Sequence, residues 1–95
     1  MKIFALSRRK EGAPLERFQA LQKAETLKVW ELYTRNIVRE IYFRSDRPGG
    51  VLVLEAASLD EARKALDELP MHKEGLTEFE FIPVGPYERW SVLFS

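Results

Sequence analysis

The order in which strand-like and helix-like segments follow one another is the feature that most constrains this chain. Alternating or β-branched and aromatic runs predict strands, whereas apolar residues spaced three and four apart predict helices. On these criteria the sequence predicts strands at 2–7, 37–44, 51–57 and 75–84, and helices at 14–35 and 58–69. The resulting order is β-α-β-β-α-β.

Local signals define the ends of the two helices. Pro14 suits the first turn of a helix, because the N–H that proline lacks is not needed there. Asn36 is a residue type that stops helices. Ser58, with Glu61 three residues later, forms a capping box. Pro70 is expected to end the second helix, and the residues that follow it are expected to form a loop.

The predicted order is that of the ferredoxin-like, split βαβ fold of the α+β class. In this fold two helices cover one face of a four-stranded antiparallel sheet. The face expected to pack under the helices is the more apolar one: Ile41, Phe43, Leu52, Leu54, Phe79 and Phe81. The opposite face, with Glu40, Tyr42, Glu55 and Glu80, is expected to meet a partner subunit or to line a cavity. A second copy of the same sheet is the usual cover for such a face.

The length of 95 residues predicts a single domain over 1–95. A chain this short buries only about 60–65% of the surface that it exposes when unfolded, so self-association would help it. The sequence contains no cysteine, which excludes disulfides and thiolate metal sites and is compatible with a cytoplasmic location. One histidine and scattered carboxylates match no metal-ligand spacing, so we expect neither a metal nor another cofactor.

The charges balance to zero, which argues against a nucleic-acid partner. They are unevenly distributed, however: residues 1–48 hold eleven Lys/Arg and six Asp/Glu, whereas residues 49–95 hold four and nine. This distribution is either ordinary surface charge or a means of steering self-assembly. No segment reaches the roughly 18 apolar residues of a membrane span, and the apolar run near residue 1 is shorter than that of a signal peptide.

One acidic residue, Glu25, stands in the middle of an apolar helical stripe. At roughly 100° per residue, this stripe gathers Leu15, Phe18, Leu21, Val29, Leu32 and Tyr33. Gln22 lies near its edge. Desolvation would raise the pKa of Glu25 toward the range of a general base. Alternatively, Glu25 is a solvated rim residue or pairs with Arg39 or Lys28.

Three strand residues are candidates for holding a ligand. Arg39 could clamp a carboxylate with two parallel hydrogen bonds, or it could form a cross-strand ion pair with Glu80 or Glu55. Tyr42, near the carboxylate of Glu40, could orient a ligand, although tyrosine in a strand is commonly a packing residue. Glu55 ends an otherwise apolar strand. It is a substrate-binding candidate, or it caps the next turn or pairs with an arginine of a neighbouring strand, Arg39 or Arg44.

The single histidine, His72, lies two residues beyond Pro70 in the predicted loop. It could act as a general acid if this loop folds over a cleft. The alternative is an ordinary surface histidine. No Gly-rich phosphate loop and no Ser–His–Asp set is present.

From residue 38 onward the sequence VREIYFRSDRPGGVLVLEAASLDEARKALDELPMHKEGLTEFEFIPVGP resembles muconolactone isomerase. The shared features are an aromatic strand, a strand ending in Glu55, SLDEA opening a helix, LP closing it, and a final strand running into a proline. The sequence is also similar to YCII-like proteins. Both families belong to the dimeric α/β-barrel superfamily, in which two ferredoxin-like sheets close face to face.

The resemblance implies a homodimer with a cleft between the first helix and the sheet that holds a small-molecule ligand. It also implies a cofactor-free proton-transfer isomerase acting on a small lactone or carboxylic acid. Glu25 would be the base, and Arg39 would hold the carboxylate that muconolactone-type substrates carry. Two alternatives stay open: a non-catalytic binding or stress-associated module, and a cofactor-free oxygenase of the same superfamily.

The segment 86–95 is apolar without a clear period; its large residues are Tyr87, Trp90, Val92, Leu93 and Phe94. Tyrosine and tryptophan are typical interface anchors. We therefore expect this tail to pack on the dimer partner, where it could close the partner's cleft.

Overall fold

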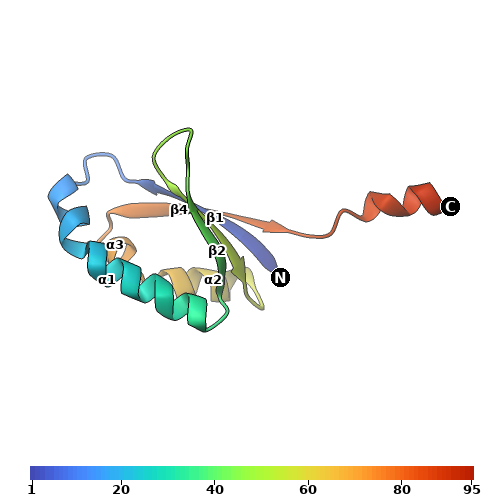
Figure 1. Ribbon diagram of the computed structural model, residues 1–95, viewed down its shortest axis with the longest axis horizontal. Helices are drawn as coiled ribbons and strands as arrows, with labels where there is room; N and C mark the ends of the chain where they lie inside the picture. Colours follow the sequence, from blue (N-terminus) through green and yellow to red (C-terminus); the bar gives the residue numbers. More distant parts are fainter.

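The computed structural model describes residues 1–95 as one antiparallel sheet with helices packed on one side of it (Figure 1). The elements are β1 (Lys2–Arg9), α1 (Leu15–Thr34), β2 (Val38–Phe43), β3 (Gly50–Glu55), α2 (Leu59–Leu66), α3 (Pro70–Lys73), β4 (Thr77–Val84) and the 3₁₀ helix η1 (Glu88–Phe94).

The strands lie in the order β2-β3-β1-β4, and every neighbouring pair is antiparallel. β1 is therefore central, and β2 and β4 are the two edges. Consecutive strands β1 and β2 are separated in space by β3, so α1 must cross over the sheet to connect them. This arrangement is the ferredoxin-like fold, and it confirms the prediction made from the order of the elements.

The helices end at the predicted capping residues, with one exception. Asn36, just past α1, adopts a left-handed φ of 62°, which ends a helix without strain for asparagine. Ser58 Oγ accepts from the backbone N–H of Glu61 at 3.2 Å, and Glu61 Oε2 accepts from the backbone N–H of Ala57 at 3.2 Å. The exception is Pro70, which opens the short helix α3 rather than only ending α2.

One core lies between the sheet and the helices. Its ten buried members are Ile3, Ala5, Leu32, Val38, Leu52, Leu54, Ala62, Ala65, Leu66 and Leu69. Phe79 and Phe81 pack against it and are partly buried. The predicted apolar face is therefore the helix-covered one, because Leu52, Leu54 and both phenylalanines lie on it.

A β-bulge in β2 corrects one detail of the predicted faces. Strict alternation places Val38 on the opposite face from Ile41. In the structure Val38 pairs with Leu54 and Glu40 pairs with Val53, so Arg39 is an extra residue. The bulge shifts the alternation by one, and Val38 becomes fully buried in the core.

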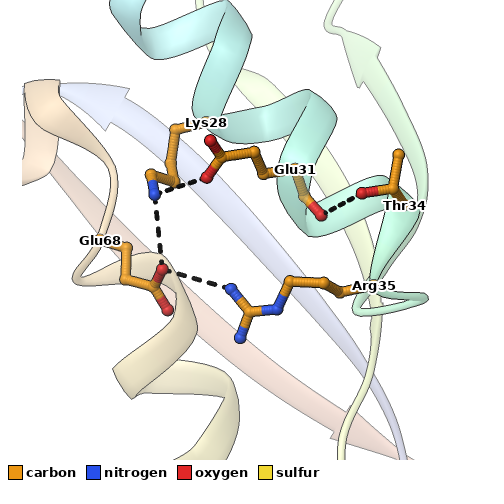
Figure 2. Close-up of polar contacts among 5 residues, drawn as sticks. All are labelled: Lys28, Glu31, Thr34, Arg35 and Glu68. Atoms are coloured by element: carbon orange, nitrogen blue, oxygen red, sulfur yellow. Dashed lines mark hydrogen bonds and ion pairs between the residues drawn. The ribbon is translucent and has the colours of Figure 1, made fainter.

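A network of charges joins the C-terminal half of α1 to the segment after α2 (Figure 2). Lys28 Nζ lies 2.6 Å from Glu31 Oε2 and 3.7 Å from Glu68 Oε1. Arg35 Nη1 lies 3.3 Å from the same Glu68 oxygen. Thr34 Oγ1 donates to the backbone carbonyl of Glu31 at 2.8 Å. Glu68 thus connects Lys28 of α1 and Arg35, just past the end of α1, to the segment between α2 and α3.

The other face of the sheet, which we call the open face, carries no helix. Its apolar side chains are Phe4, Leu6, Tyr42, Val51, Val53, Ile82 and Val84. The carboxylates Glu40, Glu55, Glu78 and Glu80 lie among them. Ile82 and Val84 remain 39% and 37% exposed. The basic residues Lys2 and Arg8 also lie on this face, so the open face is mainly apolar with charges of both signs among the apolar residues.

Beyond β4 the chain leaves the body and ends in η1, which extends away from the sheet (Figure 1). Its large apolar side chains are between 61% and 85% exposed. The molecule measures 57 × 29 × 20 Å, and the projecting tail accounts for the long axis. No helix combines the length and the apolar character that crossing a membrane requires.

Candidate functional site

A cleft of about 500 Å³ opens between α1 and the helix-covered face of the sheet. Its lining is mostly apolar: Ser7, Gln22, Glu25, Thr26, Val29, Ile41, Tyr42, Phe43, Gly50, Leu52, Leu69, Met71, Thr77 and Phe79. These residues come from α1, α3 and all four strands or their ends. The cleft expected between the first helix and the sheet is thus present. Its volume lies within the range of small-molecule sites.

The cleft exists because two small residues form its floor. Ser7 of β1 pairs directly with Gly50 of β3, where the core end of the same strands carries Ile3 opposite Leu54. Ser7 Oγ accepts from the backbone N–H of Gly50 at 2.9 Å. A Cβ at Gly50 would lie 2.9 Å from Ser7 Oγ, so a larger residue there would force the Ser7 hydroxyl to move and would disturb this hydrogen bond.

Glu25 enters this cleft from α1 and is half-buried. Its Oε1 accepts from the backbone N–H of Met71 at 2.9 Å, which ties α1 to α3. Desolvation raises the pKa of the Glu25 carboxyl, against the lowering effects of the Met71 hydrogen bond and of the nearby His72. Glu25 is the single carboxylate among the residues that line the cleft. Neither Arg39 nor Lys28 pairs with it, because Lys28 bonds Glu31 and Glu68 instead.

His72 lies on α3, beside the cleft rather than among its lining residues. Its Nδ1 lies 3.1 Å from the carbonyl of Thr77, and its Nε2 lies 3.1 Å from Asp67 Oδ1. Its ring packs edge-on to Phe79 at 5.3 Å. Both ring nitrogens thus face oxygen atoms of the chain. These contacts hold the His72 ring in place beside Glu25.

Gln22 and Tyr42 both border the cleft, in different ways. Gln22 lies one helical turn before Glu25, so the two side chains share one face of α1. Tyr42 lines the cleft along β2, but it pairs with Val51, which places its side chain on the open face. There its hydroxyl donates to Glu40, and this hydrogen bond raises the pKa of Tyr42.

The structure does not bring Arg39 and Glu55 to the cleft. Glu55 Oε1 lies 2.8 Å from the Met1 amino group, and this pairing holds the pKa of Glu55 below its usual range. Neither of the arginine partners expected for Glu55 forms that contact, because Arg44 pairs with Asp46. Arg39 forms no ion pair with Glu55 or Glu80, although its charge contributes to lowering the pKa of Glu55.

A second hollow, of about 460 Å³, lies under the loop between β2 and β3. It is mostly polar and is lined by Leu6, Ser7, Arg8, Arg44, Arg47, Pro48, Glu78, Phe79 and Glu80. Its arginines are partly engaged: Arg8 Nε lies 2.7 Å from Glu78, and Arg44 donates twice to Asp46, at 2.8 and 2.9 Å. Because Arg8 and Arg44 are already paired, fewer of their N–H donors are available to a ligand than the composition of the hollow implies.

Several cleft residues are not candidates on sequence alone. Ser7, Gly50, Met71 and Thr77 lie at strand ends and turns, where no hydrophobic period indicates which way they point. The GG dipeptide at 49–50 indicates only a turn. Gly50 matters for the cleft because it pairs with Ser7 across the sheet, and the spacing of residues along the sequence does not reveal this pairing.

Comparison with known proteins supports the fold but assigns the chain to no family. No protein-family model matches the sequence, and no curated protein matches it. A solved structure that does match is 5-chloro-2-hydroxyhydroquinone dehydrochlorinase from Burkholderia phenoliruptrix, in complex with 2,5-dihydroxybenzoquinone. It aligns with a TM-score of 0.73 at 18% identity, over 90% of this chain and 94% of that chain. At this identity the similarity establishes the shared fold alone.

Proposed function

We propose that this protein binds a small, uncharged, unsaturated carbonyl compound in the cleft and isomerises it by proton transfer through Glu25. The observation that carries the proposal is the position of this carboxylate. Oε1 accepts from Met71, apolar side chains surround the group, and its pKa is raised. A carboxylate with a raised pKa is a stronger base, and its efficiency peaks when the pKa approaches the working pH.

The proton transfer needs only two residues. Glu25 Oε2 takes a proton from the carbon beside the carbonyl, which breaks a C–H bond, forms an O–H bond and leaves an enolate. The side-chain amide of Gln22, one turn away, donates a hydrogen bond to the enolate oxygen. Glu25 then returns the proton to the far end of the conjugated system. The double bond has moved, and no atoms have been gained or lost.

The charge of the lining favours an uncharged substrate. No lysine or arginine lines the cleft, and Arg39, the expected carboxylate clamp, projects from the bulge in β2. A substrate carboxylate would therefore lie near Glu25 without a cation to offset the repulsion. Of the two predicted substrate classes, a small lactone fits this cleft better than a carboxylic acid.

We also propose that the protein is a homodimer that buries the open face. The half-exposed Ile82 and Val84 and the strand residues beside them form an apolar surface that a second sheet would cover. Only 13 of the 95 residues are buried in the isolated chain, so its core is small and pairing would enlarge it.

The experiment that tests the isomerase follows hydrogen exchange rather than product formation. The protein is incubated in D₂O with a panel of unsaturated γ-lactones and cyclic enones, and deuterium uptake beside the carbonyl is measured by NMR. We expect uptake by the unaltered protein and a loss of about 10²–10⁴-fold in Glu25→Gln, since general-base catalysis contributes about this much. Glu16→Gln, an exposed acid of the same helix, is the matched control and should exchange normally.

A second candidate, a binding module without catalysis, also has support in the structure. Glu25 is the only carboxylate in the lining, so catalysis would require this one residue both to take and to return the proton, whereas binding alone makes no such demand. Under this alternative the same compounds bind but show no deuterium uptake. Equal uptake in Glu25→Gln and the unaltered protein would contradict the role of Glu25 directly.

A further inference from the structure

The segment 86–95 contains apolar surface arranged on one side of a helix. A 3₁₀ helix has three residues per turn, so residues three apart are aligned. In η1 this spacing aligns Tyr87, Trp90 and Leu93, which we call the tail ridge. The rings of Tyr87 and Trp90 already pack edge-on at 5.1 Å. The three side chains are 61%, 64% and 73% exposed, so the tail ridge is formed but uncovered.

A 3₁₀ helix of this length needs something to pack against. Runs longer than three or four residues are uncommon, because their hydrogen bonds are poorly oriented. η1 spans seven residues and contains no buried residue. A surface packed against the tail ridge would therefore stabilise η1 in this conformation.

Three exposed apolar side chains lie on the elements that form the cleft, and two of them belong to its lining. Trp30 of α1 and Ile41 and Phe43 of β2 are 60%, 46% and 96% exposed, and we call these three residues the cleft rim. Ile41 and Phe43 line the cleft itself, so whatever covers the rim also covers the opening. The ring of Trp30 stacks on Tyr33 at 5.6 Å, which extends the apolar surface along α1.

The tail does not lie near the cleft rim of its own chain. Thr77, at the start of β4, lines the cleft, whereas the tail leaves from Val84 at the other end of that strand, about 23 Å away at about 3.3 Å per residue. The rim lies on the edge strand β2, and the tail follows the opposite edge strand β4. Figure 1 shows the tail pointing away from the body and from the N-terminal half of α1.

We propose that the tail ridge of each subunit packs on the cleft rim of a second copy and closes that copy's cleft. The inference rests on the dimer proposed above. Ile82 and Val84 of the open face lead directly into the tail, so a partner paired on this face lies next to the start of the tail. Two-fold symmetry then produces two equivalent contacts, each joining one tail to one rim.

The contact between the tail ridge and the cleft rim gives each cleft a cover. Phe43, which lines the cleft on the edge strand β2, is 96% exposed in the isolated chain. Covering the edge with a tryptophan and a leucine excludes water from Glu25, which strengthens every polar interaction at the carboxylate. The aromatic members of the tail ridge bury about 150–250 Å² each when fully covered, a substantial part of a standard interface.

Cross-linking between two distinguishable copies tests the contact. Because the chain has no cysteine, Ser91→Cys in the tail and Ser45→Cys beside the rim each create a unique thiol without removing an apolar side chain. The two variants are co-expressed, treated with a short bis-maleimide reagent, and analysed by mass for the mixed product. We expect the mixed product to form about 10²-fold faster than with Asp60→Cys replacing Ser45→Cys, because the contact raises the effective concentration of one thiol near the other.

A second substitution separates the tail contact from dimerisation. Adding Trp90→Ser and Leu93→Ser to the Ser91→Cys copy should reduce the mixed product to the Asp60→Cys level, whereas adding Glu88→Ser and Arg89→Ser should not. Sedimentation is measured on every sample. A dimer that gives no excess of mixed product overturns the tail contact and leaves the open-face dimer intact, and a monomer overturns both. Neither result bears on deuterium uptake through Glu25, which is measured separately.

Discussion

The two ends of the helix-covered face are built from the same sheet and the same helix, but one is solid and the other is hollow. At the solid end, the fully buried Ile3, Leu54 and Val38 of the sheet meet Leu32 of α1 and Leu66 of α2. At the hollow end, Ser7 and Gly50 form the floor of a cleft below α1. The size of the floor residues therefore decides whether the space under a helix is filled.

The contacts that hold α1 against the rest of the molecule also differ between its two halves. Its C-terminal half is held by the buried Leu32 and by the charges around Glu68 (Figure 2). Its N-terminal half relies on an ion pair between Arg17 and Glu74, on Arg9 over the ring of Phe18 at 4.9 Å, and on the Glu25–Met71 hydrogen bond. The buried contacts of α1 are thus concentrated at one end, and Glu25, whose pKa is raised by burial, lies outside that end.

The strongest test of this comparison removes a side chain from the solid end. Leu54→Ala should lower the free energy of unfolding by about 2–5 kcal/mol, because it leaves a cavity between fully packed neighbours. Phe43→Ala, at the rim of the hollow end, should change it by less than about 0.5 kcal/mol in the monomer, since Phe43 is 96% exposed. Urea denaturation at low protein concentration measures both. Similar losses in the two variants would show that the two ends are equally packed.

The next test uses pH to examine the hollow end. The Glu25 pKa is raised in the folded chain above the ordinary value of 4.5, so the folded state holds this proton more tightly than the unfolded state does. The contribution of Glu25 to stability is fully present below about pH 4.5 and is lost as the pH rises through the folded pKa. Glu25→Gln removes this titration, so its stability relative to the unaltered protein should increase across that interval. A constant difference across the interval would mean that Glu25 is fully solvated.

The smallest expected effect on stability comes from removing one of the charges at the solid end. Glu68→Ala removes the acceptor shared by Lys28 and Arg35, but these side chains are 29–52% exposed, and ion pairs that water can reach contribute little. We expect a loss of stability far below that of Leu54→Ala, and we expect it to disappear at high salt, where exposed charges are screened. Denaturation midpoints at low and high ionic strength measure this. A salt-independent loss would indicate that Glu68 acts through packing.

Much of the fold and part of the cleft follow from the sequence. The strand and helix periods predict the ferredoxin-like order, and the apolar side of the strands predicts which face the helices cover. The position of Glu25 within an apolar stripe predicts a half-buried carboxylate, because a helix of 3.6 residues per turn fixes which residues share a side. The partners of that carboxylate are not predicted. They come from α3, 46 residues away along the chain.

The remaining candidates show where sequence reasoning ends. Arg39 projects from a bulge that strict alternation does not anticipate, and Glu55 is paired with the Met1 amino group rather than with an arginine. His72 lies on a short helix that Pro70 begins, with both ring nitrogens engaged. In each case the partner comes from a distant segment or the backbone departs from its regular period.

The sequence by itself determined the order of the elements, the covered face of the sheet and the side of α1 on which Glu25 lies. These are properties of residues close together along the chain, and the periods of 2 and 3.6 express them directly. Only the tertiary structure decided that Ser7 meets Gly50, that Met71 bonds Glu25, and that a cleft separates them from α1. Those contacts depend on strand register and on which side chains are small where distant segments meet, and no local pattern records either.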